Sequence, residues 1–152
     1  MFSTPYKVNL RWSDLDPNFH LKHSSYYDLA SQHRIEMLNY YGLTLKVMEE
    51  QHFAPILMRE ECIFFREIKY ADLVYIHLKI KEVNSDGSRW TLVHEFVDDK
   101  KKKKAQLTVE IVWFDIQKRR IAKPLPEAAA NTYKLIMEEQ EKPNSSDQYP
   151  GA

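Results

Sequence analysis

Apolar and polar residues alternate along several segments of the chain, which is the period-2 pattern of strands with one buried face. The alternation first appears over Tyr6–Trp12. A long strand with a bend near Pro55 is predicted over His52–Ile68, and the alternation returns over Val74–Val83, Arg89–Val97 and Ala105–Phe114. The pattern therefore predicts a sheet of about five strands, and the run of consecutive strands indicates that they pair antiparallel.

Between the first and second of these segments the spacing of apolar residues changes to three and four, which is typical of a helix with one broad apolar face. This spacing extends from Ser25 to Tyr41. Ser25 and Asp28 resemble a capping box at its start, and Gly42 suits the left-handed residue that closes a helix. The sequence thus predicts one long helix, and we expect it to lie across the apolar face of the sheet.

Outside these strands and the long helix, the sequence predicts one short helix, a hairpin tip and a tail. A polar stretch follows Gly42. A short C-terminal helix is predicted over Glu127–Gln140, because Pro126 suits a first helical turn and the segment is rich in alanine, leucine and glutamate. Residues 1–141 are expected to form a single domain, and residues 142–152 a disordered tail. The lysine-rich segment Asp98–Lys104 is predicted to be a solvated hairpin tip, although its lysines could instead contact phosphates.

Composition narrows the functional classes. The 152 residues include 22 basic and 22 acidic side chains, so no net charge recruits nucleic acid or a membrane. No secretory signal or transmembrane stretch is evident, and a single cysteine, Cys62, favours a reducing compartment, so the cytoplasm is expected. Cys62 has no clustered metal ligands nearby, and the chain has only 3 glycines and no phosphate-binding loop, so we expect neither a metal site nor nucleotide hydrolysis.

The segment Ser13–Ser24 has no sustained periodicity and is predicted to be a loop that carries two carboxylates, Asp14 and Asp16. The first turn of a helix leaves backbone N–H groups free and is positively polarised, so an acyl carbonyl oxygen at His23 and Ser24 would be polarised. A carboxylate such as Asp16 could act on that carbonyl as a general base or as a nucleophile. The alternative is that Asp16 only forms the turn, and we expect Asp14 to be the structural member of the pair.

The stretch DLDPNFHLKHSSYY resembles the active-site segment of the 4-hydroxybenzoyl-CoA thioesterase family of hot-dog proteins. That pattern has an Asp-x-Asp pair, a histidine four positions after the second Asp, an amide or histidine seven after it and a tyrosine ten after it. These positions are Asp16, His20, His23 and Tyr26 here. The order of predicted elements over residues 6–137 also resembles the α+β hot-dog fold, in which a curved antiparallel sheet wraps a long central helix.

The resemblance implies hydrolysis of an acyl-CoA thioester, with no cofactor because coenzyme A is part of the substrate. Asp16 would be the catalytic carboxylate, and the backbone N–H near His23 would hold the thioester oxygen. The resemblance also implies a homodimer or homotetramer with the site at a subunit interface, so that residues of a second subunit complete it. The expected substrate-binding residues are His20, Ser24, Tyr26, Met58, Arg59 and Cys62.

Two departures from the family pattern leave other functions open. Phe19 stands where many relatives have glycine, and Lys22 stands where asparagine is common, which would suit a non-catalytic acyl-binding module. The segment DPNFH also resembles the Asp-x-Asn-Pro-x-His segment of enoyl-CoA hydratases of the same fold. The register disagrees, because His20 follows Asp16 by four residues rather than five.

Overall fold

The computed structural model describes residues 5–142. Its sheet contains β1 (Tyr6–Val8), β2 (Phe53–Phe64), β3 (Val74–Val83), β4 (Arg89–Asp98), β5 (Lys103–Asp115) and β6 (Arg120–Ile121). The strands lie in the order β1-β3-β4-β5-β2, with β6 paired to β5, and all the pairs are antiparallel. The expected tail, residues 142–152, lies outside the described residues except for its first position.

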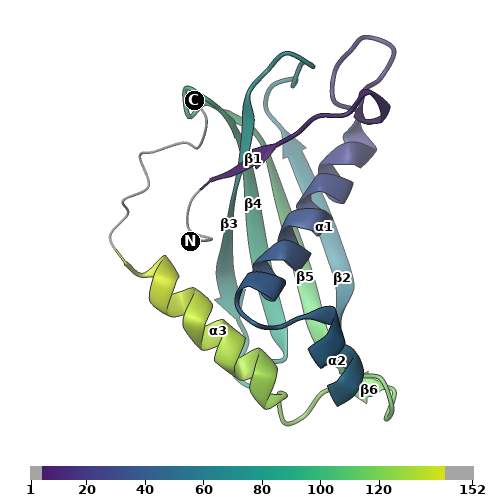
Figure 1. The fold of residues 1–152 in the computed structure, drawn as a ribbon, viewed down its shortest axis with the longest axis vertical. Coiled ribbons are helices and arrows are strands. Elements are labelled where there is room, and N and C mark those ends of the chain that lie inside the picture. Colours follow the sequence, from purple (N-terminus) through teal and green to yellow (C-terminus); the bar gives the residue numbers. More distant parts are fainter. Residues whose placement is uncertain (1–4, 143–152) are drawn as a thin grey trace.

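The long helix α1 (His23–Tyr40) runs across one face of the curved sheet, and α3 (Glu127–Gln140) lies beside β3 (Figure 1). This confirms the α+β hot-dog architecture that the resemblance implied. The bounds predicted for the strand Val74–Val83 and for the C-terminal helix match the structure. A short helix, α2 (Leu45–Gln51), lies in the stretch that we described only as polar.

The first predicted strand is wrong in its length. It ends at Val8 rather than at Trp12, and Trp12–Asp14 form a 3₁₀ turn, η1. The reason is that the Asp14 side chain accepts the backbone N–H of Arg11, which bends the chain away from the sheet. Trp12 is consequently 71% exposed, whereas strand alternation would have buried it.

The predicted bend in the second strand is also displaced. Pro55 pairs regularly with Trp113 of β5, and the register shift falls between Leu57 and Arg59, where Met58 is the extra residue. Proline is tolerated at position 55 because β2 is the last strand in the sheet order, so the missing N–H can face the open edge. The bulge exposes Met58.

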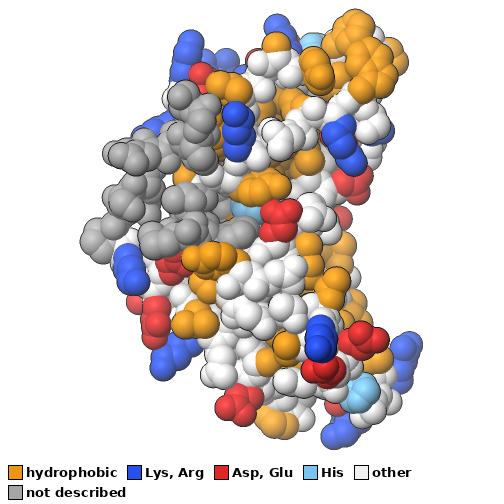
Figure 2. Space-filling model, in the orientation of Figure 1, with side chains coloured by type: hydrophobic (Ala, Val, Ile, Leu, Met, Phe, Trp, Pro, Cys, Tyr) orange, Lys and Arg blue, Asp and Glu red, His pale blue; other side chains and the backbone are white. Residues whose placement is uncertain are grey.

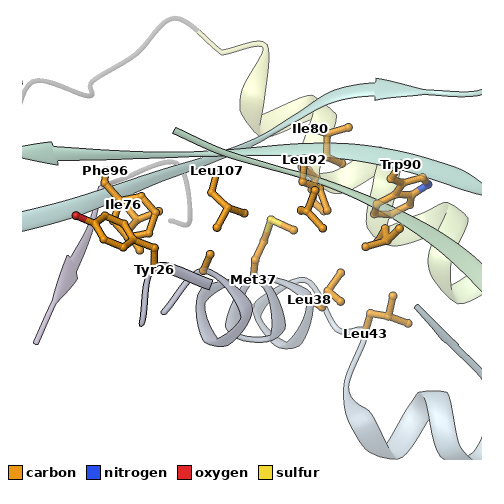
Figure 3. Packing of buried hydrophobic residues seen from close by; sticks show 14 of the residues in the cluster. Tyr26, Met37, Leu38, Leu43, Ile76, Ile80, Trp90, Leu92, Phe96 and Leu107 are labelled. Carbon is orange, nitrogen blue, oxygen red and sulfur yellow. The ribbon is translucent and has the colours of Figure 1, made fainter. Parts of the chain in front are cut away.

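The core lies between α1 and the sheet. Buried residues recur on one face of α1 at Tyr26, Ala30, His33 and Met37, spaced by four, three and four, as the helical period requires. Figure 3 shows Tyr26 and Met37 pointing at buried side chains of the sheet. These are Ile76 and Ile80 of β3, Trp90, Leu92 and Phe96 of β4, and Leu107 of β5.

The end of α3 is fixed to the outer edge of β3. The Gln140 side chain donates to the carbonyl of Ile80 at 2.8 Å and accepts the N–H of Ile80 at 3.0 Å. These two backbone groups lie beyond the end of β1, which pairs with β3 only at Val74–Ile76. Gln140 therefore satisfies groups that the sheet leaves open.

Replacement of Gln140 by alanine is expected to lower the free energy of unfolding by about 1–3 kcal/mol, since it leaves both Ile80 groups without their partner. Urea unfolding followed by circular dichroism measures the loss. The control is Glu138→Ala on the exposed face of the same helix, which should change little. Equal midpoints for the two variants would show that the contact does not stabilise the fold.

Candidate active site

The loop between η1 and α1 is organised by Asp14. This carboxylate is 2% exposed and accepts the backbone N–H of Arg11 at 2.9 Å and its guanidinium at 2.9 and 3.2 Å. Burial alone would raise the pKa of Asp14, but the hydrogen bonds from Arg11 outweigh it and hold the pKa below its ordinary value. The prediction that Asp14 binds loop backbone is confirmed.

Asp16 is half-buried and uses one carboxylate oxygen to hold its own turn. Oδ1 accepts the backbone N–H of Asn18 at 2.9 Å and that of His20 at 3.1 Å. Asp16 therefore forms the turn, as the structural alternative predicted. Oδ2, however, accepts no hydrogen bond from any residue between 5 and 142, so one oxygen is fixed while the other can meet water or a substrate.

Backbone pairing connects Asp16 to the helix start. Asp16 N–H donates to His20 at 2.8 Å, Leu15 bridges Leu21, and Lys22 N–H donates to the carbonyl of Asp14 at 2.9 Å. Residues 14–16 and 20–22 thus form two short antiparallel segments, and α1 begins directly after the second. Leu21 N–H also donates to Ile68 at 2.8 Å, which ties the loop to the segment before β3.

The first turn of α1 has free donors. The helix begins at His23, two residues before the predicted capping box at Ser25, and Lys22 at the N-cap position makes no side-chain cap bond. Within the described part of the chain, the N–H groups of His23 and Ser24 have no backbone acceptor, and both residues are exposed. The capping-box prediction is therefore wrong, and the uncapped turn leaves two positively polarised donors available.

His20 and Tyr26 lie near this turn but are engaged elsewhere. His20 Nδ1 is 3.3 Å from the Glu67 carboxylate. Tyr26 is buried, with its ring 5.0 Å from Phe64 and 5.3 Å from Phe96, and burial raises its pKa to about 12. Figure 3 shows Tyr26 between α1 and the sheet, beside Ile76 and Phe96.

The predicted β2 residues are spread along the strand, and Cys62 lies close to Tyr26 and Tyr27 of α1. Phe64 contacts Tyr26, in the first turn of α1, but Met58 lies six residues away, about 20 Å along the strand. Arg59 pairs with Glu61 at 2.9 Å. Cys62 is half-buried, and burial raises its pKa to about 11, so its thiol stays protonated at neutral pH.

A pocket of about 210 Å³ lies between α1 and the β2 side of the sheet. Its walls are mostly apolar, and its charged side chain is Arg34. The lining residues are Ser31, Arg34, Ile35, Met37, Leu38, Pro55, Leu57, Trp90, Leu92 and Ile111. This pocket was not predicted from the sequence, although its α1 residues share one helical face at three- and four-residue spacing, namely Ser31, Arg34, Ile35 and Leu38.

Two further findings concern other kinds of site. In residues 5–142 no three His, Cys, Asp or Glu side chains gather in a way that could hold a metal ion. No helix in that range is long and apolar enough to cross a membrane.

Comparison with known proteins gives one family match and many similar folds. The model of the thioesterase-like superfamily matches residues 10–132. No match is found among curated proteins. A search of solved structures finds 162 similar chains.

Three of these structures illustrate the range of TM-score and sequence identity. A hypothetical protein of Staphylococcus aureus in complex with CoA has a TM-score of 0.81 at 16% identity, covering 97% of this chain and 89% of that one. The DHNA-CoA thioesterase of Staphylococcus aureus has a TM-score of 0.76 at 13% identity, covering 94% and 98%. A Thermus thermophilus thioesterase complexed with coenzyme A and zinc has a TM-score of 0.70 at 22% identity, covering 88% and 94%. At these identities the likeness shows a shared fold.

Proposed function

The chain belongs to the thioesterase-like superfamily, and from that membership we propose that it hydrolyses an acyl-CoA thioester. The observation that carries the proposal is the pairing of two groups in one loop. Asp16 has a positioned carboxylate with Oδ2 open, and the α1 start that follows has uncapped N–H groups at His23 and Ser24. Structures that share the fold include two solved with CoA, which supports a CoA ester as the substrate.

In the proposed reaction the thioester carbonyl oxygen accepts hydrogen bonds from the first turn of α1. Negative charge develops on this oxygen as the carbonyl carbon is attacked, and donors fixed in advance stabilise it. Asp16 Oδ2 either removes a proton from the attacking water or attacks the carbonyl carbon itself to give an anhydride that water then opens. Either route releases the acid and the CoA thiol and needs no cofactor.

The acyl group is proposed to enter the pocket between α1 and the sheet. Ser31, the first pocket residue on α1, is seven residues beyond Ser24, about 10 Å along the helix axis. The mostly apolar walls suit a hydrocarbon group. This placement favours an acyl group long enough to extend about two helical turns from the reacting carbonyl.

A homo-oligomer is proposed to form through β2. Within residues 5–142 this strand pairs only with β5, so its outer edge is open. It also exposes large apolar side chains, namely Ile56, Leu57, Met58, Ile63 and Phe64. Figure 2 shows hydrophobic side chains along this side of the molecule. A second copy would cover these groups and could bring its Met58, Arg59 and Cys62 to the pocket.

The test of the proposed function is thiol release from a panel of acyl-CoAs of increasing chain length, together with an aryl-CoA. We expect release from at least one member, with the longer aliphatic chains preferred. Absorbance of an enoyl-CoA is followed in parallel, because hydration consumes the conjugated double bond whereas hydrolysis leaves it. Binding without thiol release across the whole panel would replace hydrolysis with the acyl-binding alternative.

A further inference from the structure

Phe19 occupies a backbone conformation that phenylalanine seldom adopts. Its φ is +61°, in the left-handed region where a Cβ crowds the following carbonyl and glycine is the favoured residue. The side chain is 57% exposed, so core packing does not compensate for the strain. A strained and exposed aromatic residue is the kind of outlier that points to a functional constraint.

A second exposed aromatic ring lies against Phe19. The ring of Trp12 is 71% exposed, and its centroid is 5.7 Å from that of Phe19 at an interplanar angle of 54°. We call these two residues the aromatic platform. Figure 2 shows hydrophobic side chains gathered at the end of the molecule where the loop before α1 lies.

The aromatic platform belongs to the same loop as the candidate catalytic carboxylate. Phe19 N–H donates to the carbonyl of Asp16 at 3.0 Å, and Phe19 accepts the N–H of Tyr70 at 3.3 Å, which anchors the turn to the segment before β3. A ligand that rests on the platform would therefore lie beside the path by which a substrate reaches Asp16.

The size of the platform favours a small planar ligand over a macromolecule. Two aromatic side chains present a few hundred Å² at most, well below what a stable protein interface buries. A nucleobase matches them better, because bases stack on exposed aromatic rings with little regard to hydrogen-bonding pattern. Arg11, paired with Asp14 at 2.9 Å, and Lys69, 3.8 Å from Glu67, lie beside the platform with mostly exposed cationic side chains, for which the phosphates of the ligand would compete with these carboxylates.

We propose that Trp12 and Phe19 bind the adenine base of the substrate's coenzyme A. This inference rests on the proposed function for the identity of the ligand. The acyl group is assigned to the pocket beside α1, so the nucleotide is the part of the substrate left at the surface. Adenine is the aromatic part of coenzyme A, and the platform offers it a stacking face.

The chain contains its own probe for this contact. Of its 3 tryptophans, Trp90 and Trp113 are fully buried and Trp12 is exposed. Trp90 lines the pocket assigned to the acyl group, so adenosine 3′,5′-bisphosphate, which has no acyl or pantetheine arm to enter that pocket, is the ligand whose quenching reports on Trp12. We expect saturable quenching by CoA and by adenosine 3′,5′-bisphosphate, no quenching by pantetheine, and loss of the signal in Trp12→Phe.

Phe19→Gly separates binding from folding. Removal of one stacking ring is expected to weaken the affinity for adenosine 3′,5′-bisphosphate about tenfold. The same change relieves the left-handed strain, so the Tm should stay level or rise by about 2 °C. A purely structural role for Phe19 would lower the Tm instead. Leu135→Ala, at an exposed apolar position on α3, is the control and should keep wild-type affinity.

Three outcomes would overturn the inference: quenching that does not saturate, full quenching by pantetheine alone, or wild-type nucleotide affinity in Phe19→Gly. The binding measurement needs no turnover. A protein that binds the bisphosphate through the platform yet releases no thiol would refute hydrolysis and leave the nucleotide site standing, so the two failures can be told apart.

Discussion

Asp16→Asn is expected to lower kcat for thioester hydrolysis by about 10²–10⁴-fold while leaving the Tm unchanged. The asparagine carbonyl oxygen can still accept the N–H groups of Asn18 and His20, which Asp16 Oδ1 accepts in the wild type. The turn and the helix start should therefore keep their geometry. The amide cannot take a proton from water or attack the carbonyl, so the chemistry alone is removed. Thiol release and a thermal melt on the same preparation measure both effects.

Two companion variants separate the roles of the carboxylate. Asp28→Asn removes an exposed carboxylate from α1, close to Asp16 in sequence, and should retain wild-type turnover. Asp16→Ala removes the turn acceptor as well as the base, so it should lose activity and also about 1 kcal/mol of stability. Wild-type kcat in Asp16→Asn would show that another group delivers the water.

The regular elements could be predicted from the sequence because a single periodicity extends over many residues. β3 matches its predicted bounds because apolar and polar residues alternate throughout it. α3 matches its predicted bounds because Glu127–Gln140 is rich in alanine, leucine and glutamate, which favour a helix. α2 was missed because seven residues are too short for the helical period to show. A local signal did exist there: the Thr44 hydroxyl oxygen accepts the N–H of Val47, as an N-cap residue does.

The loop that carries the candidate site could be predicted only in outline. The Asp-x-Asp pattern located Asp14 and Asp16, and the turn-forming tendency of aspartate predicted their bonds to backbone N–H groups. The helix start was misplaced because Ser25 and Asp28 fit a capping box by type, whereas Ser25 N–H donates to the carbonyl of Lys22 instead. The left-handed φ of Phe19 could not be predicted from phenylalanine itself. Only the glycine that many relatives have at this position suggests a positive φ.

The contacts of Arg34 could not be predicted from periodicity, because its partners are far away in the sequence. Its partner Glu60 lies on another element, and its second neighbour, His94, is 60 residues away in the chain, so no local pattern connects them. Arg34 lines the pocket beside α1, with its guanidinium 3.5 Å from the Glu60 carboxylate and 3.5 Å from His94 Nε2. Burial holds the pKa of His94 well below its ordinary value, so the ring adds no second positive charge.

Glu60→Gln is expected to lower the free energy of unfolding by about 2–4 kcal/mol. The side chain of Arg34 is only 12% exposed, and burial lowers its pKa while Glu60 raises it, so the carboxylate is what makes the buried guanidinium tolerable. Without that carboxylate the buried guanidinium of Arg34 keeps its positive charge with no anionic partner. Arg34→Met should cost less, because the Glu60 side chain is 23% exposed and can regain water.

The double variant Arg34→Met with Glu60→Gln tests this reasoning most directly. It removes the buried charge itself, so it should recover most of the stability that Glu60→Gln loses, and the interaction energy from the cycle should be about 1–3 kcal/mol. Urea unfolding at one fixed protein concentration is required, since an oligomer's apparent stability depends on concentration. If the double variant is as unstable as Glu60→Gln alone, Glu60 stabilises the fold through contacts other than Arg34. Arg34 also borders the pocket, so KM for the preferred acyl-CoA should be measured for the wild type, the two single variants and the double variant. A change in KM shared by the two proteins that carry Arg34→Met would show that this arginine forms part of the acyl-binding wall.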